Sequence, residues 1–318
     1  KIYGLGSGDV KLDFLCKLKA CERYVDRKLK MPIYLVGTCA EEIGMLGAKF
    51  LIKSKALNPK YVLVGEPSEL AIISAHKAYC VYKISIVYNQ PERDAKGFNT
   101  RMEMTCFGKS AHGSYPHLGD NAIYKMLESL KKIRDANFQI KVSRIKGGDA
   151  VNKVPDSASV EFFLQSSSFD DFKRFYREKL AVEPLNNQIQ IQFGGLGETG
   201  IKFLPDGMLD GIDAVRQMFE KFKSGILSSR DETFNPAEST INLGTVLNAD
   251  GQLQMSYDIR LMPDVSADEF DLALKKEVAE INKNYPSLIM KVTKVRVNPS
   301  LNMKEDSELI RAALDAQK

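Results

Sequence analysis

The sequence contains no tryptophan and only three histidines, which are His76, His112 and His117. No apolar run approaches the roughly 18 residues that a membrane span needs. The net charge is only +4, and no stripe of Lys and Arg interleaved with aromatic residues marks a nucleic-acid surface. No GxSxG motif is present, which argues against a serine-nucleophile α/β hydrolase. The composition is that of an ordinary soluble globular protein.

Cysteine is scarce as well. The five residues Cys16, Cys21, Cys39, Cys80 and Cys106 are odd in number and lack CxxC spacing. They are predicted to be reduced, mostly buried thiols of a cytosolic-type protein, and a cytoplasmic location is expected. Because the chain has no initiator Met, its true start is expected upstream, and a signal peptide there stays open.

Residues 1–78 show a pattern typical of α/β proteins. Apolar residues recur at helical spacing from Val10 to about Lys30, and MPIYLVGT then reads as a buried strand. A helix is expected from Glu41 to about Leu57, followed by a short buried strand in YVLVGEPS. This order predicts a mostly parallel sheet covered by helices.

From Tyr79 onward the pattern changes to paired strands with one helix between pairs, which is typical of α+β structure. The stretch that begins FGKSAHGSYPHLG and the stretch that begins FGGLGETGIKF share one order of strands, turns and helices. An internal duplication is favoured over two unrelated units, with repeats at about 79–183 and 184–298. Residues 299–318 are expected to return to the first domain, so that 79–298 is an insertion.

Four carboxylates stand at element ends in the first domain. Asp9 follows the small-residue loop of GLGSGDVK, Glu41 and Glu42 stand where a strand is expected to become a helix, and Glu66 ends the next strand. Each has an ordinary explanation, as an N-cap, a favourable first helical turn or a strand-end cap. Together they are expected to gather at one edge of the sheet.

Carboxylates gathered at one edge need a compensating charge, because uncompensated buried charge is costly. Only Lys11 and Lys77 lie close to these motifs. A pair of divalent metal ions is the natural partner. One carboxylate can bridge two ions about 3.5–4 Å apart, others complete the coordination, and one more can act as a base.

The chain resembles the M20 family of metallopeptidases and amidohydrolases, which includes acetylornithine deacetylase, succinyl-diaminopimelate desuccinylase and dipeptidases. The resemblance rests on five motifs in family order, namely GLGSGDVK, TCAEEIGMLGA, GEPSELAIISAHKA, GKSAHGSYPHLGDNAI and GGDAVNKVPD. It implies a zinc-exopeptidase-like first domain with an inserted, ferredoxin-like α+β lid.

The resemblance also implies roles for the four carboxylates. Asp9 resembles the aspartate that bridges two zinc ions, and Glu41 resembles the general base that takes a proton from the attacking water. Glu42 and Glu66 resemble ligands of the individual zinc ions. Two zinc ions per full-length chain are therefore expected, with Co or Mn as substitutes.

In the lid, His112 of SAHGSYPHLG resembles the histidine that stabilises the oxyanion of the tetrahedral intermediate. Asn152 of AVNKVPD matches a family asparagine that helps to bind substrate. Arg260 of YDIRLMPD resembles the arginine that holds the substrate's carboxylate, although a strand-surface salt bridge is an ordinary alternative. His76 and His117 are expected to be structural.

The family's upstream HxD motif and its histidine ligand near the C-terminus are absent from this sequence. Each zinc would then lose its imidazole ligand, so this fragment is itself expected to be metal-poor and inactive.

The function expected for the full-length protein is zinc-dependent hydrolysis of an N-acyl amino acid, a reaction of amino-acid metabolism. The alternatives are an M20 dipeptidase or carboxypeptidase, and a metal-free binding protein of the same fold. The substrate would be a small molecule, with neither nucleic acid nor membrane as partner. A monomer with a built-in pseudo-dimer lid is favoured over a homodimer, because His112 and Asn152 lie in the first repeat and Arg260 lies in the second.

Overall fold

The computed structural model describes residues 4–88, 92–93, 97–182, 188–196, 201–249, 251–303 and 306–318. It divides into two compact units. Unit 1 comprises Lys1–Ala75 and Asn302–Lys318, and unit 2 comprises His76–Leu301. The chain passes from one unit to the other within the short strands β1 (Ala75–His76) and β12 (Leu301–Asn302). The roles expected for these units, a metal-binding domain and a lid, stay predictions.

Unit 1 is built from helices and irregular segments. Its regular elements are η1 (Ser7–Lys11), α1 (Leu12–Glu22), α2 (Leu46–Ser54) and α7 (Glu308–Gln317). Helix α7 is capped by Ser307, whose hydroxyl accepts the Ile310 N–H at 3.4 Å.

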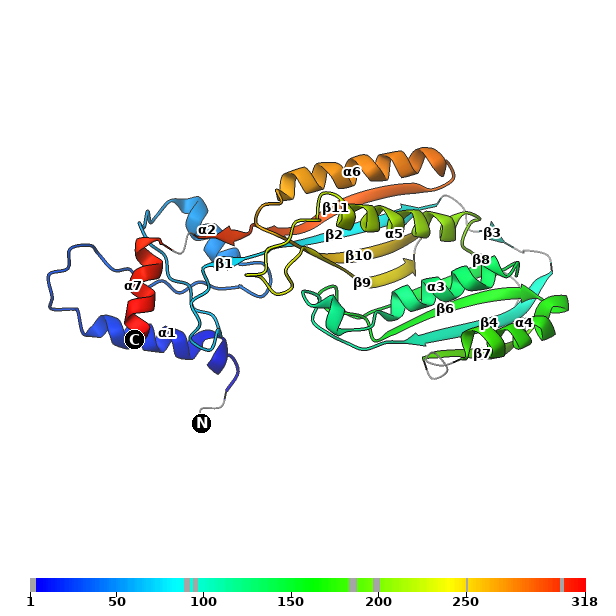
Figure 1. The fold of residues 1–318 in the computed structure, drawn as a ribbon, viewed down its shortest axis with the longest axis horizontal. Coiled ribbons are helices and arrows are strands. Elements are labelled where there is room, and N and C mark those ends of the chain that lie inside the picture. Colours follow the sequence, from blue (N-terminus) through cyan, green and yellow to red (C-terminus); the bar gives the residue numbers. More distant parts are fainter. Residues whose placement is uncertain are drawn as a thin grey trace. The chain divides into compact units, whose positions relative to one another are not determined.

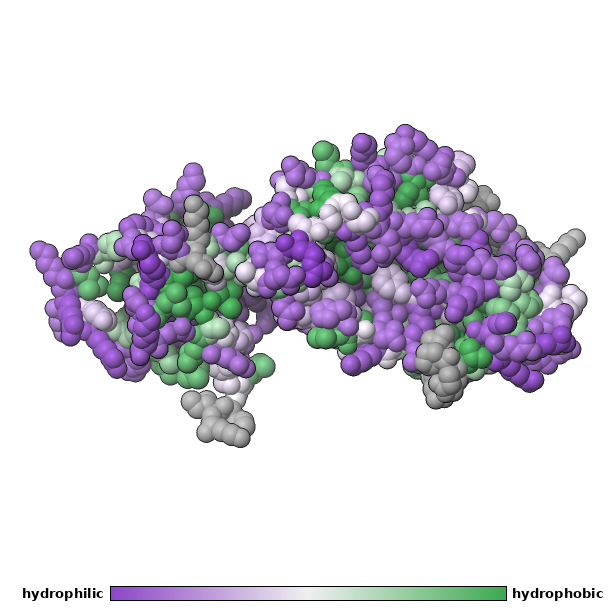
Figure 2. All heavy atoms as spheres, in the orientation of Figure 1, coloured by the Kyte–Doolittle hydropathy of each residue, from purple (hydrophilic) through white to green (hydrophobic). Residues whose placement is uncertain are grey.

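The strands expected at residues 31–38 and 61–68 are not formed, and the expected parallel sheet is therefore not confirmed. A strand persists only where a neighbour satisfies its backbone N–H and C=O groups. In the described part of unit 1, neither segment has a paired strand beside it. Their apolar side chains stay exposed, as for Ile33 and Leu63, and Figure 2 shows apolar residues on the surface of this unit.

Unit 2 is an eight-stranded antiparallel sheet with four helices packed on it (Figure 1). Across the sheet the strand order is β11-β2-β10-β9-β5-β6-β4-β7. The elements are β2 (Ala78–Val87), β4 (Phe98–Phe107), α3 (Ala122–Asp135), β5 (Lys141–Gly147), β6 (Ser157–Gln165), α4 (Phe169–Phe175), β7 (Ile189–Leu196), α5 (Met208–Ser224), β9 (Thr240–Ala249), β10 (Gln252–Leu261), α6 (Ala267–Asn284) and β11 (Ile289–Asn298). Strands β3 (Glu92–Arg93) and β8 (Lys202–Phe203) form a separate pair, and the short turns η2 (Pro116–Leu118), η3 (Ser166–Ser168) and η4 (Tyr176–Leu180) lie between these elements.

The two halves of the sheet share one topology. In chain order the first half is β4-α3-β5-β6-α4-β7, and the second is β2-α5-β9-β10-α6-β11. Their strand orders, β7-β4-β6-β5 and β11-β2-β10-β9, meet at the central pair β5 and β9. The first half is inserted between β2 and α5 of the second. The halves are therefore not consecutive along the chain, although consecutive repeats were expected. The expected junction at residues 183 and 184 lies outside the described residues.

One core fills the space between the sheet and the helices. Alternate side chains of each strand point into it, such as Ile84 on β2 and Met104 on β4, and Ile123 and Phe219 reach it from α3 and α5. Burial of each such side chain contributes about 1.5–3 kcal/mol. The amide of Asn121 caps α3 by accepting the Ile123 N–H at 2.9 Å.

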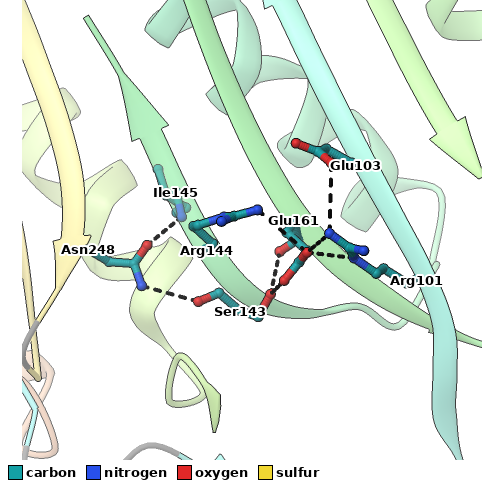
Figure 3. Close-up of polar contacts among 7 residues, drawn as sticks. All are labelled: Arg101, Glu103, Ser143, Arg144, Ile145, Glu161 and Asn248. Carbon is teal, nitrogen blue, oxygen red and sulfur yellow. Dashed lines mark hydrogen bonds and ion pairs between the residues drawn. The ribbon is translucent and has the colours of Figure 1, made fainter. Parts of the chain in front are cut away.

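The seam between the halves is held by side chains as well as by backbone. Strands β5 and β9 pair at only two positions, Lys146 with Leu247 and Gly147 with Val246. Beyond these, the Asn248 amide accepts the Ile145 N–H and donates to the Ser143 carbonyl, the latter at 3.1 Å (Figure 3). The side chain therefore substitutes for backbone pairing where the strands diverge.

Candidate functional site

The four predicted metal-site carboxylates all lie in unit 1. Asp9 lies in η1, Glu41 and Glu42 begin the turn that precedes α2, and Glu66 lies in the irregular segment 61–68. All four residues are solvent-exposed.

Their charges nevertheless act on one another. Partial burial raises the pKa of Glu66, and the charges of Asp9, Glu41 and Glu42 raise it further. Such mutual repulsion is what a divalent cation relieves, so the donor chemistry suits a metal. Among the residues that the structure describes, however, no three His, Cys, Asp or Glu side chains are arranged to hold an ion. The metal-ligand roles therefore stay predictions.

In unit 2, the predicted residues His112 and Asn152 lie on two paired loops of the first half. The Gly113 N–H donates to the Asn152 carbonyl at 2.7 Å, and the Val154 N–H donates to the Ala111 carbonyl at 2.8 Å. These hydrogen bonds flank an isolated antiparallel β-bridge between His112 and Lys153. Two segments about 40 residues apart are thereby held as one rigid corner.

The His112 ring is oriented by the residue two positions further on. The Ser114 N–H donates to Nδ1 of His112 at 3.2 Å, and the Ser114 hydroxyl lies 2.6 Å from the same nitrogen. A neutral imidazole accepts on one nitrogen and donates from the other. This arrangement favours a proton on Nε2, which makes Nε2 a donor on an exposed side chain.

The predicted carboxylate-binding Arg260 lies on β10 of the second half. Its Nε and a terminal nitrogen bind the two oxygens of Asp258 at 2.7 and 3.0 Å, and its guanidinium carbon lies 3.8 Å from the ring centroid of Tyr79. Asp258 is fully buried. Because the described residues engage only two of the five N–H groups, the guanidinium retains donors for a second anion.

The corner that carries His112 also touches the residue that supports Arg260. A Cβ added at Gly113 would lie 2.7 Å from Oδ2 of Asp258. On the neighbouring strand, the Asn242 amide donates to the carbonyls of Val151 and Lys153 at 3.3 and 3.0 Å. The corner that carries His112 and Asn152 therefore lies against the carboxylate that binds Arg260, across the two halves of one sheet.

The sequence analysis missed two residues of this site. Asp258 stands two positions before Arg260, and strand alternation places both on one face. Tyr79 pairs directly with Arg260 across β2 and β10. The DxR spacing in YDIRLMPD was the available signal for Asp258, whereas only the register identifies Tyr79.

Comparison with known proteins agrees with this architecture. Residues 98–181 match the M20 peptidase dimerisation domain, which covers most of the first half of the sheet. Acetylornithine deacetylase of Buchnera aphidicola subsp. Schizaphis graminum is 29% identical over 187 residues, which are 52% of this chain and 42% of that protein. Acetylornithine deacetylase of Vibrio cholerae serotype O1 is 31% identical over 170 residues, which are 48% of this chain and 40% of that protein.

Among solved structures, the aminoacylhistidine dipeptidase of Vibrio alginolyticus has a similar fold. The TM-score is 0.51 at 17% identity, and the match covers 74% of this chain and 48% of that one. The predicted resemblance is confirmed: the chain is similar to M20 metallopeptidases and amidohydrolases. It spans about two fifths of the length of the deacetylases it matches.

Proposed function

We propose that this chain belongs to a hydrolase that cleaves the amide bond of an N-acyl amino acid with an attacking water. The observation that carries the proposal is that Gly113, next to His112, lies against the Asp258 carboxylate that holds Arg260. This corner offers an oxyanion donor and a carboxylate receptor from distant parts of the sequence. The acetylornithine deacetylases among its relatives support the same reaction class.

Each side chain takes a distinct part. Arg260 binds the α-carboxylate through the donors that Asp258 leaves unused, and Asn152 helps to position the substrate. Nε2–H of His112 donates to the oxygen that becomes negative as water adds to the carbonyl carbon. Glu41 takes the proton of the attacking water and passes it to the leaving amine.

The proposed cofactor is a pair of zinc ions, with Co or Mn as substitutes. Asp9, Glu42 and Glu66 would supply oxygen ligands, with Asp9 shared between the ions. Bound zinc would lower the pKa of water and polarise the scissile carbonyl.

Dipeptide hydrolysis is the second candidate, and the duplicated topology of unit 2 favours it. The dipeptidase of Vibrio alginolyticus shares this fold over 74% of the chain. Glu66 favours a deacylase instead, because in this family a glutamate there accompanies deacylases and carboxypeptidases. The third candidate function is that of a metal-free binding protein in which Arg260 still binds a carboxylate.

The same topology supports a proposal about the oligomeric state. In dimeric relatives the oxyanion histidine reaches the active site from the partner subunit. Here both halves of the sheet lie in one chain, so we infer a monomer whose first half plays the partner's part. Light scattering that gave twice the chain's mass would overturn this inference and favour a homodimer.

The decisive experiment is metal analysis of the full-length protein by mass spectrometry, after zinc loading and desalting, followed by assays on N-acyl amino acids and on dipeptides. About two zinc ions per chain and release of an amino acid from the N-acyl substrates are expected. Retention of no metal, with no cleavage of either class, would leave the binding-protein reading. The expected cytoplasmic location stays a prediction, and no helix in the described part of the chain is long and apolar enough to cross a membrane.

A further inference from the structure

A row of four polar side chains crosses one face of the second half of the sheet. The register pairs Asn298 of β11 with Tyr79 of β2, Tyr79 with Arg260 of β10, and Arg260 with Thr240 of β9. Residues directly opposite each other on antiparallel strands point to the same face. All four side chains therefore belong to one surface.

Two members of this row are buried without a partner. Oγ1 of Thr240 and Oδ1 of Asn298 make no hydrogen bond to any residue that the structure describes, although both atoms are inaccessible to solvent. Thr240 as a whole is only 6% exposed. Buried polar atoms are almost always paired. The Thr240 hydroxyl can donate to an acceptor supplied from outside the chain, whereas the amide oxygen of Asn298 can only accept.

The neighbouring guanidinium of Arg296 lacks a counter-ion. It lies on the same face, because Arg296 pairs with Val81 two residues from Tyr79. Its guanidinium carbon is 5.6 Å from the Tyr79 ring centroid, and within the described ranges no carboxylate forms an ion pair with it. Arg260, on the other neighbour of the same tyrosine, is already balanced by Asp258.

Tyr79 lies within the electrostatic reach of both arginines. Burial raises the pKa of Tyr79, Asp258 raises it further, and Arg260 and Arg296 both lower it, so both guanidinium groups act on the phenol. The nearby Lys77 is occupied, because its ammonium donates to the carbonyls of Pro236 and Glu238 at 2.6 Å each.

From this geometry we propose that the row recognises a substrate with two carboxylates. Arg260 and the Thr240 hydroxyl bind the α-carboxylate, and Arg296 binds a second carboxylate. Strands β10 and β11 are separated by one strand, and hence by about 10 Å, with the Tyr79 ring between them. The substrate class is therefore an N-acylated acidic amino acid, or a dipeptide with an acidic residue, and this assignment rests on the proposed hydrolase function.

The test uses N-acetylglutamate and its isostere N-acetylglutamine, whose side chain is uncharged, with binding to the full-length protein measured by calorimetry. N-acetylglutamate should bind at least about tenfold more tightly, which corresponds to about 1.4 kcal/mol. Arg296→Gln should abolish that preference without changing the affinity for N-acetylglutamine, and Arg296→Lys should restore part of it. Lys291→Gln, which removes one positive charge from an exposed position on the same strand, is the matched control and should change neither affinity.

Thr240→Val separates a ligand role from a structural one. Removal of an unpaired buried hydroxyl should leave the melting temperature unchanged or higher, while the affinity for both ligands falls several-fold. Equal binding of the two ligands by the unmodified protein would overturn the proposal, as would an unchanged preference in Arg296→Gln.

The outcome also separates this inference from the hydrolase function. Cleavage of N-acyl amino acids without a preference for acidic ones would reject the second carboxylate site alone. Tight, Arg296-dependent binding of N-acetylglutamate without cleavage of any amide would reject the hydrolase function and keep the site.

Discussion

The backbone of Gly113 lies directly against the carboxylate of Asp258. A Cβ at position 113 would come within 2.7 Å of Oδ2 of Asp258 and within 3.0 Å of the Asn152 backbone. The contact joins the corner that carries His112 to the buried carboxylate that orients Arg260. Only glycine fits at position 113, because a Cβ there would clash with Asp258. The loop that carries His112 and the carboxylate that orients Arg260 are therefore packed directly against each other.

Gly113→Ala should therefore damage both ends of the site. The added methyl must displace either the corner or the Asp258 carboxylate, and overpacking of this kind costs about 1–3 kcal/mol. We expect a lower midpoint in urea and weaker binding of N-acyl amino acids. Gly195→Ala is the matched control, because a Cβ at 195 meets nothing within 4 Å. Equal affinity in the two variants would show that Gly113 does not position Arg260.

His112→Asn should lower kcat far more than it changes KM. The exposed imidazole donates to an oxygen whose negative charge develops only in the transition state, and loss of one such donor typically costs about 100- to 1000-fold. Steady-state kinetics of amide cleavage by the full-length protein measure this. A comparable rise in KM with kcat preserved would instead assign His112 to ground-state substrate binding.

Asn248→Ala should weaken the seam between the halves of the sheet. The substitution leaves the Ile145 N–H and the Ser143 carbonyl without their partner, and unpaired buried groups cost about 1–3 kcal/mol (Figure 3). Urea unfolding reports the change in free energy, and hydrogen exchange at Ile145 localises it. Gln254→Ala, on neighbouring β10, serves as the control. If both variants unfold at the same urea concentration, the side-chain bridge contributes nothing.

The cysteines should fall into distinct reactivity classes. Cys16 and Cys39 are exposed, Cys21 is intermediate, and Cys80 and Cys106 are buried. Burial raises the pKa of Cys80 to about 11 and that of Cys106 to about 12, so these thiols stay protonated and unreactive as the pH rises from 7 to 9.

Alkylation followed by peptide mass spectrometry measures these classes. We expect rapid labelling of Cys16 and Cys39 and labelling of Cys80 and Cys106 only after unfolding. Modification of Cys106 as fast as that of Cys39 in the native protein would contradict the burial. The sequence analysis had expected mostly buried thiols, and that expectation is wrong for the cysteines of unit 1.

Local sequence patterns were sufficient where the physics is local. The motifs around His112 and Asn152 pointed to the resemblance to the M20 family because turns, caps and short loops depend on a few neighbouring residues. Helical spacing likewise indicated α1 and α2, although their observed ends lie inside the expected ones. The strands expected at 31–38 and 61–68 failed because an apolar run does not state which backbone will pair with it.

The sequence by itself determined the resemblance to the M20 family and the α+β character of residues 79–298. It also identified three residues of the candidate site, which are His112, Asn152 and Arg260. Only the tertiary structure decided that one half of the sheet is inserted into the other, and that the ring of Tyr79 lies against Arg260. The physical reason is that strand register joins residues far apart in the chain, such as Tyr79 and Arg260. Such pairings depend on the complementarity of whole surfaces, which periodicity along one segment does not encode.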